Sequence, residues 1–266
     1  MVDNEDVSDS LSIRAGAVEA DIAPELGGRL AQLTVDGTPL LVGHSPGVEA
    51  TGWGCYPMVP WAGRIRCGRF TFDGVDHQLP INFGDHAIHG VGFTSSWEIE
   101  ARSDDRLTLG LTLPSDESWP FGGRATQQFS VDADGLTMSM TVTAAERAFP
   151  VSFGWHPWFR KPDILGFHPT AMYRRDDDSI TVDELVDVPP GPWDDCFVNT
   201  EPVTVGVGQI DIELTSNCDR WVVYDEPDHA TCIEPQTGPP DAFNIAPHRL
   251  GPGESLSAWY RIARRS

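Results

Sequence analysis

The stretch Asp134-Gly-Leu-Thr-Met-Ser-Met-Thr-Val142 decides the fold class. Apolar and polar side chains alternate along it with a period of two, as in a β-strand that buries one face. The Asp-Gly pair before the strand is typical of tight hairpin turns. The same alternation predicts further strands in eight other segments, at 18–22, 30–35, 70–72, 97–101, 107–113, 210–214, 221–224 and 256–262.

The turns between these segments predict antiparallel pairing. Asp36-Gly37, Asp73-Gly74 and Asp134-Gly135 are candidates for tight primed turns in which Gly supplies a positive φ. No window keeps the apolar stripe of an amphipathic helix, and 26 Gly and 22 Pro oppose long helices. We expect an all-β fold, a large antiparallel β-sandwich with little helix.

The domain organisation is expected to be simple. No shift in composition and no repeat divides the chain, so one domain is predicted over residues 11–266, after a frayed tail at 1–10. The charge-dense stretch Arg174–Asp178 is predicted to be a solvated loop.

Composition limits the partners and the compartment. With 40 acidic and 18 basic residues the net charge is −22, which disfavours nucleic acid and anionic membrane surfaces. It favours a soluble protein whose substrate is neutral, or is an anion bound by local cations. Five cysteines without a C-x-x-C pair fit neither a disulfide framework nor a zinc knuckle. No basic and apolar leader and no run of 18 apolar residues is found. We therefore expect a cytoplasmic protein that does not cross a membrane.

Two segments in the first half of the chain combine residue types that can bind a ligand. Residues 56–70 are apolar and Pro-rich and end in Arg64, Arg66 and Arg69, which can bind sugar hydroxyls or an anion, or simply pair with surface carboxylates. Residues 82–92 form a Gly-punctuated loop with His86 and His89. A third metal ligand is missing from this motif, so a hydrogen-bonding or catalytic His is favoured over a metal site, the alternative being two turn histidines.

Two later segments offer a proton donor and a proton acceptor. In residues 149–159, strand alternation puts His156 on one face with Ser152 and Gly154, whose small side chains are expected to leave room for a ligand. In residues 231–244, Glu234 follows an apolar strand, where burial is expected to raise its pKa as a general base requires. Each residue could alternatively have a purely structural role.

Taken together, these segments resemble the aldose 1-epimerase (galactose mutarotase) family. The joint occurrence of the motifs, in family order, is specific, although each alone is weak. The matching motifs are GRIRCGRF at 63–70, IHG at 88–90, HPWF at 156–159, WDDCF at 193–197 and IEPQTGPPDAFN at 233–244.

The resemblance implies a galactose mutarotase-like β-sandwich with an open carbohydrate groove and neither metal nor cofactor. It implies that His156 is the general acid, Glu234 the general base and His89 a second active-site His. Gly63 departs from the pattern, because many members have Asn there. Further candidates for contact with the sugar are Arg64, Asp194, Gln236 and Asn82, with aromatic faces from Trp61, Phe83 and Trp158.

The expected reaction interconverts the α and β anomers of a hexose by opening and reclosing the ring, with His156 as imidazolium and Glu234 as carboxylate flanking the sugar from opposite sides. A hexose-6-phosphate 1-epimerase of the same fold is a rival, because Arg64, Arg66, Arg69 and Arg124 could bind a phosphate. A non-catalytic carbohydrate-binding or sensing domain is a second rival.

Overall fold

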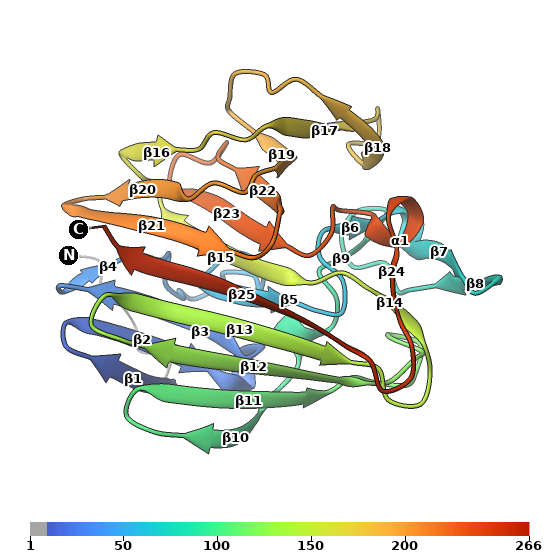
Figure 1. Ribbon diagram of the computed structural model, residues 1–266, viewed down its shortest axis with the longest axis horizontal. Helices are drawn as coiled ribbons and strands as arrows, with labels where there is room; N and C mark the ends of the chain where they lie inside the picture. Colours follow the sequence, from blue (N-terminus) through green and yellow to red (C-terminus); the bar gives the residue numbers. More distant parts are fainter. Residues whose placement is uncertain (1–9, 266) are drawn as a thin grey trace.

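The computed structural model describes residues 10–265 and has two large β-sheets that pack against each other as a sandwich (Figure 1). Among the described strands, every pair is antiparallel. The predicted antiparallel β-sandwich with little helix is confirmed. The predicted frayed tail, apart from Ser10, lies outside the described residues.

The first sheet has eleven strands and carries the candidate site. In spatial order it consists of β1 (Leu11–Ala15), β2 (Val18–Ala23), β3 (Arg29–Val35), β5 (Cys55–Met58), β15 (Gly154–Arg160), β23 (Ala230–Gln236), β22 (Arg220–Tyr224), β19 (Asp194–Val198), β17 (Ala171–Arg175) and β18 (Thr181–Val186), with β4 (Thr38–Pro39) paired to β3.

The second sheet has eight strands and covers one face of the first. Its order is β10 (Glu98–Arg102), β11 (Arg106–Thr112), β12 (Arg124–Val131), β13 (Gly135–Thr143), β25 (Ser255–Arg264), β21 (Ile210–Ser216), β20 (Val203–Val207) and β16 (Ile164–Gly166).

Short elements complete the described chain around one end of the sandwich. They are the pairs β14 (Phe149–Val151) with β24 (His248–Leu250), β6 (Arg64–Ile65) with β9 (Ala87–Ile88) and β7 (Arg69–Phe72) with β8 (Val75–Gln78), the helix α1 (Ala242–Ile245), and the 3₁₀ turns η1 (Pro24–Leu26), η2 (Arg66–Gly68) and η3 (Gly92–Thr94).

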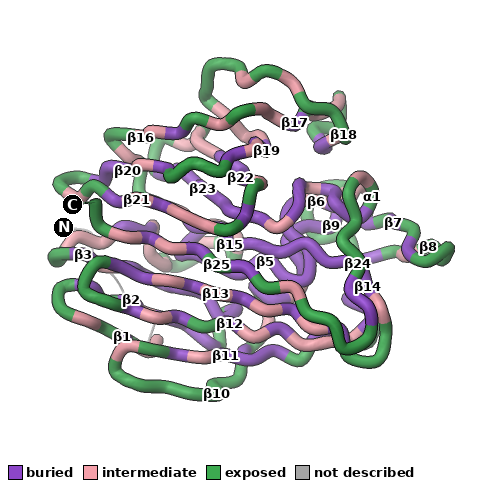
Figure 2. Tube along the Cα trace, in the orientation of Figure 1, coloured by how far each residue is buried: buried purple, intermediate pink, exposed green. Residues whose placement is uncertain are grey.

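The core lies between the two sheets, as the burial pattern of β13 shows. Leu136, Met138, Met140 and Val142 are buried, while the Thr and Ser residues between them are half-buried on the outer face (Figure 2). Alternating side chains of a strand point to opposite faces, so this pattern pins the pairing register. The strand predicted from Asp134–Val142 therefore has the orientation that its sequence indicates.

A buried polar link also joins the two sheets. The Nε1–H of Trp155 on β15 donates to Oε1 of Gln127 on β12 over 3.0 Å, and Nε2 of Gln127 donates to the carbonyl of Gly28 over 2.8 Å. Both polar groups of Gln127 are thus satisfied in the core, where an unpaired amide would destabilise the fold.

Two of the three predicted hairpin turns have the expected geometry. Asp36-Gly37 and Asp73-Gly74 have positive φ at both residues and join β3 to β4 and β7 to β8. The prediction was wrong for Asp134-Gly135, because Gly135 starts β13 without a positive φ. There the carboxylate of Asp132 accepts the backbone N–H groups of Asp134 and Gly135, and so closes a longer connection.

No helix in the described part of the chain is long and apolar enough to cross a membrane.

Candidate active site

The site occupies the face of the first sheet that points away from the second sheet. The register of β15 with β5 sets His156 opposite Tyr56. The register of β15 with β23 pairs Gly154 with Gln236 and therefore sets His156 beside Glu234. Residues 78 positions apart in the sequence thus become neighbours through strand pairing alone.

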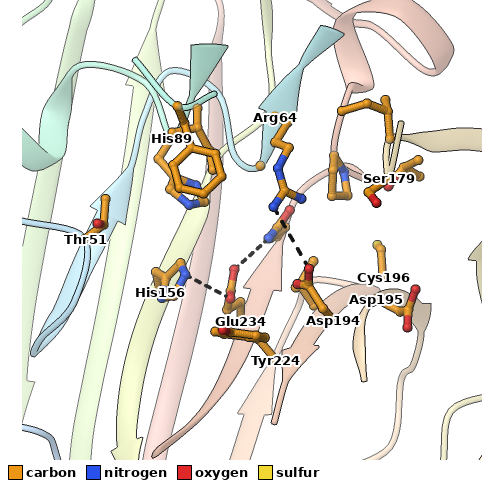
Figure 3. A pocket seen from close by; sticks show the side chains of 18 of the residues that line it. Thr51, Arg64, His89, His156, Ser179, Asp194, Asp195, Cys196, Tyr224 and Glu234 are labelled. Atoms are coloured by element: carbon orange, nitrogen blue, oxygen red, sulfur yellow. Dashed lines mark hydrogen bonds and ion pairs between the residues drawn. The ribbon is translucent and has the colours of Figure 1, made fainter. Parts of the chain in front are cut away.

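The imidazole and the carboxyl group are in direct contact. Nε2 of His156 lies 3.2 Å from Oε1 of Glu234, and Nε2 of Gln236 donates to the other carboxyl oxygen over 3.1 Å (Figure 3). The expectation that the two groups flank the ligand from opposite sides was wrong, because they project from adjacent strands of one sheet. Both line the same pocket.

Burial controls the proton of this pair. It raises the pKa of Glu234 well above the usual value, and the negative charge of Asp194 raises it further, while Gln236 and Arg64 oppose this effect. Burial lowers the pKa of His156, and the nearby positive charge of Arg29 adds to this effect. The raised pKa expected of Glu234 is confirmed, whereas a stable imidazolium at His156 is disfavoured. Both pKa shifts are accommodated when Glu234 and His156 share one proton in the hydrogen bond between them.

The space predicted beside His156, next to Gly154 and Ser152, is occupied by atoms of neighbouring segments of the protein. A Cβ atom on Gly154 would lie 2.3 Å from the carbonyl oxygen of Pro235, and one on Gly238 would lie 3.1 Å from the hydroxyl of Ser152. Small side chains are therefore needed for the close approach of β23 and the segment after it, so the predicted reason for Gly154 and Ser152 was wrong.

The loop after β9 places His89 above the pair. His89 has a φ of 61°, is buried, and packs edge-on at 5.1 Å between ring centroids against His156. Burial lowers the pKa of His89 well below the usual value, and His156 and Arg64 lower it further. His86 does not join it, since its Nδ1 accepts the backbone N–H of Cys67. The two histidines of this loop therefore do not form a metal pair.

A charged wall faces the pair from β6, β17 and β19. Arg175 donates to Asp194 over 3.1 Å and lies 2.8 Å from Asp195, and Arg64 is 4.0 Å from Asp194. Burial raises the pKa of Asp194, although Arg64 and Arg175 oppose this. The wall presents carboxylate oxygens and guanidinium donors together, which suits sugar hydroxyls.

One edge of the pocket is a segment, residues 175–181, that we call the strap. Its residues Arg175, Ser179, Ile180 and Thr181 line the pocket. Asp176 and Asp178 in the strap form ion pairs with Arg66.

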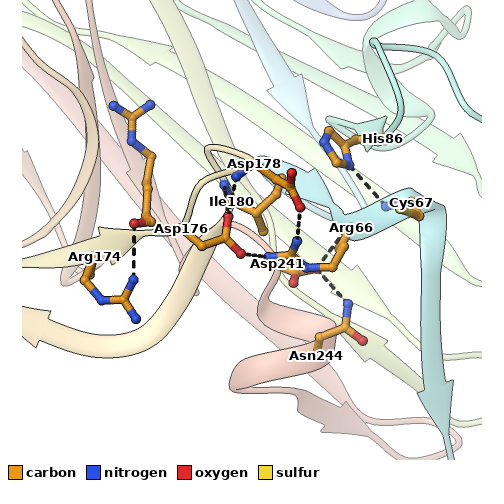
Figure 4. A network of polar contacts seen from close by, with 10 residues as sticks. Arg66, Cys67, His86, Arg174, Asp176, Asp178, Ile180, Asp241 and Asn244 are labelled. Atoms are coloured by element: carbon orange, nitrogen blue, oxygen red, sulfur yellow. Dashed lines mark hydrogen bonds and ion pairs between the residues drawn. The ribbon is translucent and has the colours of Figure 1, made fainter.

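Asp176 also fixes the local shape of the strap. Its Oδ1 accepts the backbone N–H groups of Asp178 and Ile180 over 3.0 and 3.1 Å (Figure 4). The prediction of a solvated loop at Arg174–Asp178 is confirmed only for Asp177 and Asp178, which are exposed in the turn after β17. It was wrong for the rest, because Arg174 and Arg175 end that strand and Asp176 pairs with Arg66 and holds a pocket wall.

Polar side-chain atoms without a protein partner cluster on the residues that line the pocket. The pocket has a volume of about 370 Å³. Leaving a buried donor or acceptor unsatisfied costs roughly 1–3 kcal/mol, so a cluster of them indicates a ligand rich in hydrogen-bonding groups. Five residues that line the pocket contribute a buried polar atom without a protein partner: Tyr56 Oη, His89 Nδ1, His156 Nδ1, Trp158 Nε1 and Gln236 Oε1.

Most of the other predicted site residues line the pocket, but two do not. Arg64, Asp194, Gln236, Phe83 and Trp158 are on its wall. Asn82 lies outside, where its side chain accepts the N–H of Ile88 and donates to the carbonyl of the same residue. Trp61 is buried in the core against Trp119 and Phe243.

Sequence reasoning did not single out Tyr56 or Arg175 as site residues. Tyr56 stacks on His156 at 4.6 Å between ring centroids. The sequence feature that could have indicated Tyr56 is its position in the Pro-rich segment 56–70, where only the arginines were considered as ligand-binding residues. Arg175 was hidden in the charge-dense stretch. Only the strand order shows that both reach the pocket.

Three of the four arginines proposed to bind phosphate are used elsewhere. Arg66 pairs with the strap, Arg69 donates to Gln78, and Arg124 pairs with Glu100. Arg64 alone of the four lines the pocket.

Comparison with known proteins gives a consistent result. The aldose 1-epimerase family profile matches residues 9–263. The Escherichia coli protein YphB is 35% identical over 148 residues, a match that spans about half of each protein, 54% of this chain and 49% of YphB.

Solved structures of low sequence identity share the fold. A GalM/aldose epimerase homologue from C. elegans has a TM-score of 0.84 at 17% identity, with 96% of this chain and 98% of that chain covered. The galactose 1-epimerase of Lactobacillus acidophilus has a TM-score of 0.82 at 16% identity, with 99% and 96% covered.

Proposed function

Because the chain belongs to the aldose 1-epimerase family, we propose that it is a mutarotase, which interconverts the α and β anomers of an unphosphorylated hexose in this pocket. The observation that carries the proposal is the His156–Glu234 contact of 3.2 Å within a pocket of unpartnered buried polar atoms. A pyranose has hydroxyls on every side of its ring, which suit the polar side chains that line the pocket. The contacting pair supplies a proton donor and a proton acceptor.

The proposed reaction moves one proton onto the sugar and one off it. Glu234 takes the proton of the anomeric hydroxyl, C1–O1 becomes a carbonyl, the bond from C1 to the ring oxygen breaks, and His156 protonates that oxygen. Rotation about C1–C2 presents the other face of the aldehyde, and the reverse transfers close the ring. Each positioned group contributes about 10²- to 10⁴-fold.

The direct contact gives the pair a means of resetting itself. After ring opening the proton of His156 is on the former ring oxygen and Glu234 carries the proton of the anomeric hydroxyl, and closure reverses both transfers. Burial favours the arrangement with both groups neutral, and the 3.2 Å contact lets the proton pass between them. Neither arrangement changes the total charge of the buried pair, which keeps the cost of the transfer low.

The other proposed roles follow from position. His89, perpendicular to His156, is proposed to bind the ring oxygen or the transient aldehyde oxygen. Arg64, Asp194 and Gln236 are proposed to hold sugar hydroxyls, and Trp158 to cover an apolar face of the ring.

Polarimetry on freshly dissolved α-D-glucose and α-D-galactose tests the proposal. The protein should accelerate the approach to the equilibrium rotation, and Glu234→Gln and His156→Asn should each lower the rate at least about a hundredfold with an unchanged circular dichroism spectrum. If the protein accelerates the mutarotation of none of the free aldoses in a panel, a non-catalytic carbohydrate-binding domain is the remaining candidate. Wild-type rates in either variant would refute the assigned roles.

The pocket charges argue against the phosphorylated rival. Four acidic residues besides Glu234 line the pocket and only Arg64 and Arg175 oppose them, both already near carboxylates. The four are Glu49, Asp194, Asp195 and Glu226. Competition between glucose and glucose 6-phosphate decides, and a preference of several hundredfold for the phosphate would overturn the free-sugar proposal.

We place the protein in the cytoplasm, with a small sugar and not nucleic acid as its partner. The five cysteines form no disulfide in the described chain, and the net charge of −22 repels phosphate backbones.

A further inference from the structure

A thiol completes a group of three metal-binding side chains at the catalytic pair. Cys232 precedes Glu234 by two residues on β23, so both point to the same face of the sheet. The ligand atoms of His156, Cys232 and Glu234 all lie within 4.8 Å of one another, and all three residues are buried. In the described chain this is the one such group of three, and the reaction proposed above does not use the thiol.

We propose that these three residues form an inhibitory site for a thiophilic divalent cation such as Zn²⁺, which shuts off the enzyme by occupying its proton-transfer pair. Zn²⁺ favours imidazole, thiolate and carboxylate ligands in a tetrahedral arrangement. The binding requires only the geometry described here, whereas the inhibition also rests on the proposed function.

The distances are close to those of such a site. Bond lengths of roughly 2.0–2.3 Å put tetrahedral ligand atoms roughly 3.3–3.7 Å apart. The His156–Glu234 separation of 3.2 Å is already near this range. The sulfur atom of Cys232 lies within 4.8 Å of both other ligand atoms, so it has to approach them by no more than about 1.5 Å.

The charge balance suits a buried site. With Zn²⁺ bound, the thiolate of Cys232 and the carboxylate of Glu234 carry two negative charges. These two charges balance the two positive charges of the ion. A buried dication is tolerated when two anionic ligands neutralise it.

The fourth tetrahedral position explains why metal and sugar should compete. His156 and Glu234 line the pocket whereas Cys232 does not, so we expect the open position of a bound ion to face the pocket, where the sugar is proposed to bind. The bound metal would coordinate the lone pairs of His156 Nε2 and of the Glu234 carboxylate, so these groups could no longer transfer protons to or from the sugar. The excess of acidic residues over basic residues attracts cations to the protein.

The test compares binding and activity in the full-length protein stripped with EDTA. Cd²⁺ added to the wild type should produce the ultraviolet charge-transfer band of a Cd²⁺–thiolate bond. Zn²⁺ should slow mutarotation, and a higher sugar concentration should weaken this inhibition. Cys232→Ser should keep the metal-free activity, lose the band, and need at least about tenfold more Zn²⁺ for half-inhibition.

Matched variants control for other thiols. Cys218→Ser removes a buried thiol outside the pocket, and Cys67→Ser removes the exposed one. Both should keep the inhibition and the Cd²⁺ band.

Two results would overturn the inference. The first is equal inhibition by Zn²⁺ and an equal Cd²⁺ band in Cys232→Ser and the wild type. The second is the absence of a Cd²⁺ band in the wild type, which does not require the variant to fold. If the protein binds Cd²⁺ through Cys232 but has no mutarotase activity, the metal site stands and the proposed function fails.

Discussion

The contribution of the buried carboxyl of Glu234 to stability should fall as the pH rises, and Glu234→Gln should remove this contribution. The folded state raises the pKa of Glu234 by burial, so the folded protein keeps a proton that the unfolded chain loses near pH 4.5. The contribution of this carboxyl to stability is therefore fully present below about pH 4.5. It is lost as the pH rises toward the folded pKa.

The magnitude follows from one proton. Each pH unit between the unfolded and the folded pKa of Glu234 changes the free energy of unfolding by about 1.4 kcal/mol. An unfolding entropy of about 2.1 cal/mol/K per residue converts this to about 2 °C in Tm per pH unit for 266 residues. The Tm of Glu234→Gln minus that of the wild type should thus increase by about 2 °C per pH unit in this window.

Thermal unfolding by circular dichroism in EDTA at several pH values measures this difference. Glu98→Gln is the control, because it makes the same chemical change at an exposed position of β10, and its Tm difference should stay constant. A difference for Glu234→Gln that is flat, or that falls with pH, would show that the folded state leaves the carboxylate charged. The proton-sharing argument would then fail.

Three further predictions concern the strap, the departure at Gly63 and metal removal. Arg66→Ala should raise the KM for the sugar roughly fivefold with less change in kcat, because loss of its ion pairs with the strap costs about 1 kcal/mol. Arg69→Ala, whose side chain donates to Gln78 and does not touch the strap, should leave the KM unchanged. Steady-state polarimetry measures both variants, and equal behaviour of the two would contradict the assigned role of the strap. Gly63→Ala should lower the free energy of unfolding by at least about 2 kcal/mol, because φ is +68° and a Cβ would lie 2.6 Å from Pro240. Gly74→Ala, at φ +79° with open space around it, should lose only the backbone part, and urea unfolding compares the two. Prolonged treatment with EDTA should not lower the mutarotation rate, and activity restored by added zinc would contradict a reaction carried by side chains alone.

The sequence predicted those features of the fold that depend on local physical chemistry. Alternation along residues 136–142 indicated a strand with one buried face, and Asp36-Gly37 and Asp73-Gly74 predicted their turns. Asp134-Gly135 failed because the Asp132 side chain binds the backbone N–H groups of both residues and so removes the need for a positive φ. A dipeptide does not reveal which side chain nearby closes the turn.

The sequence predicted the residues of the candidate site better than their arrangement. Alternation separates Trp155, in the core, from His156 and Trp158 on the other face, and both of these line the pocket. It could not exclude Trp61, which an unbroken apolar stretch can direct to either side. Nor could it show that the charges of the strap pair with Arg66, because the partners lie 110 positions apart in the sequence.

The contact between His156 and Glu234 depends on a register that the core enforces. A slip of one residue between β15 and β23 would turn the buried Ile233 toward the pocket and drive Glu234 into the apolar layer between the sheets. An unpaired carboxyl there costs several kcal/mol, and the slip would also withdraw Ile233 from the core. The sandwich therefore holds the imidazole and the carboxyl group at one fixed separation. The residues that fix the register are apolar and lie on the face of the sheet opposite the pocket. Variants that loosen the core at Ile233 should for this reason impair catalysis before they unfold the protein.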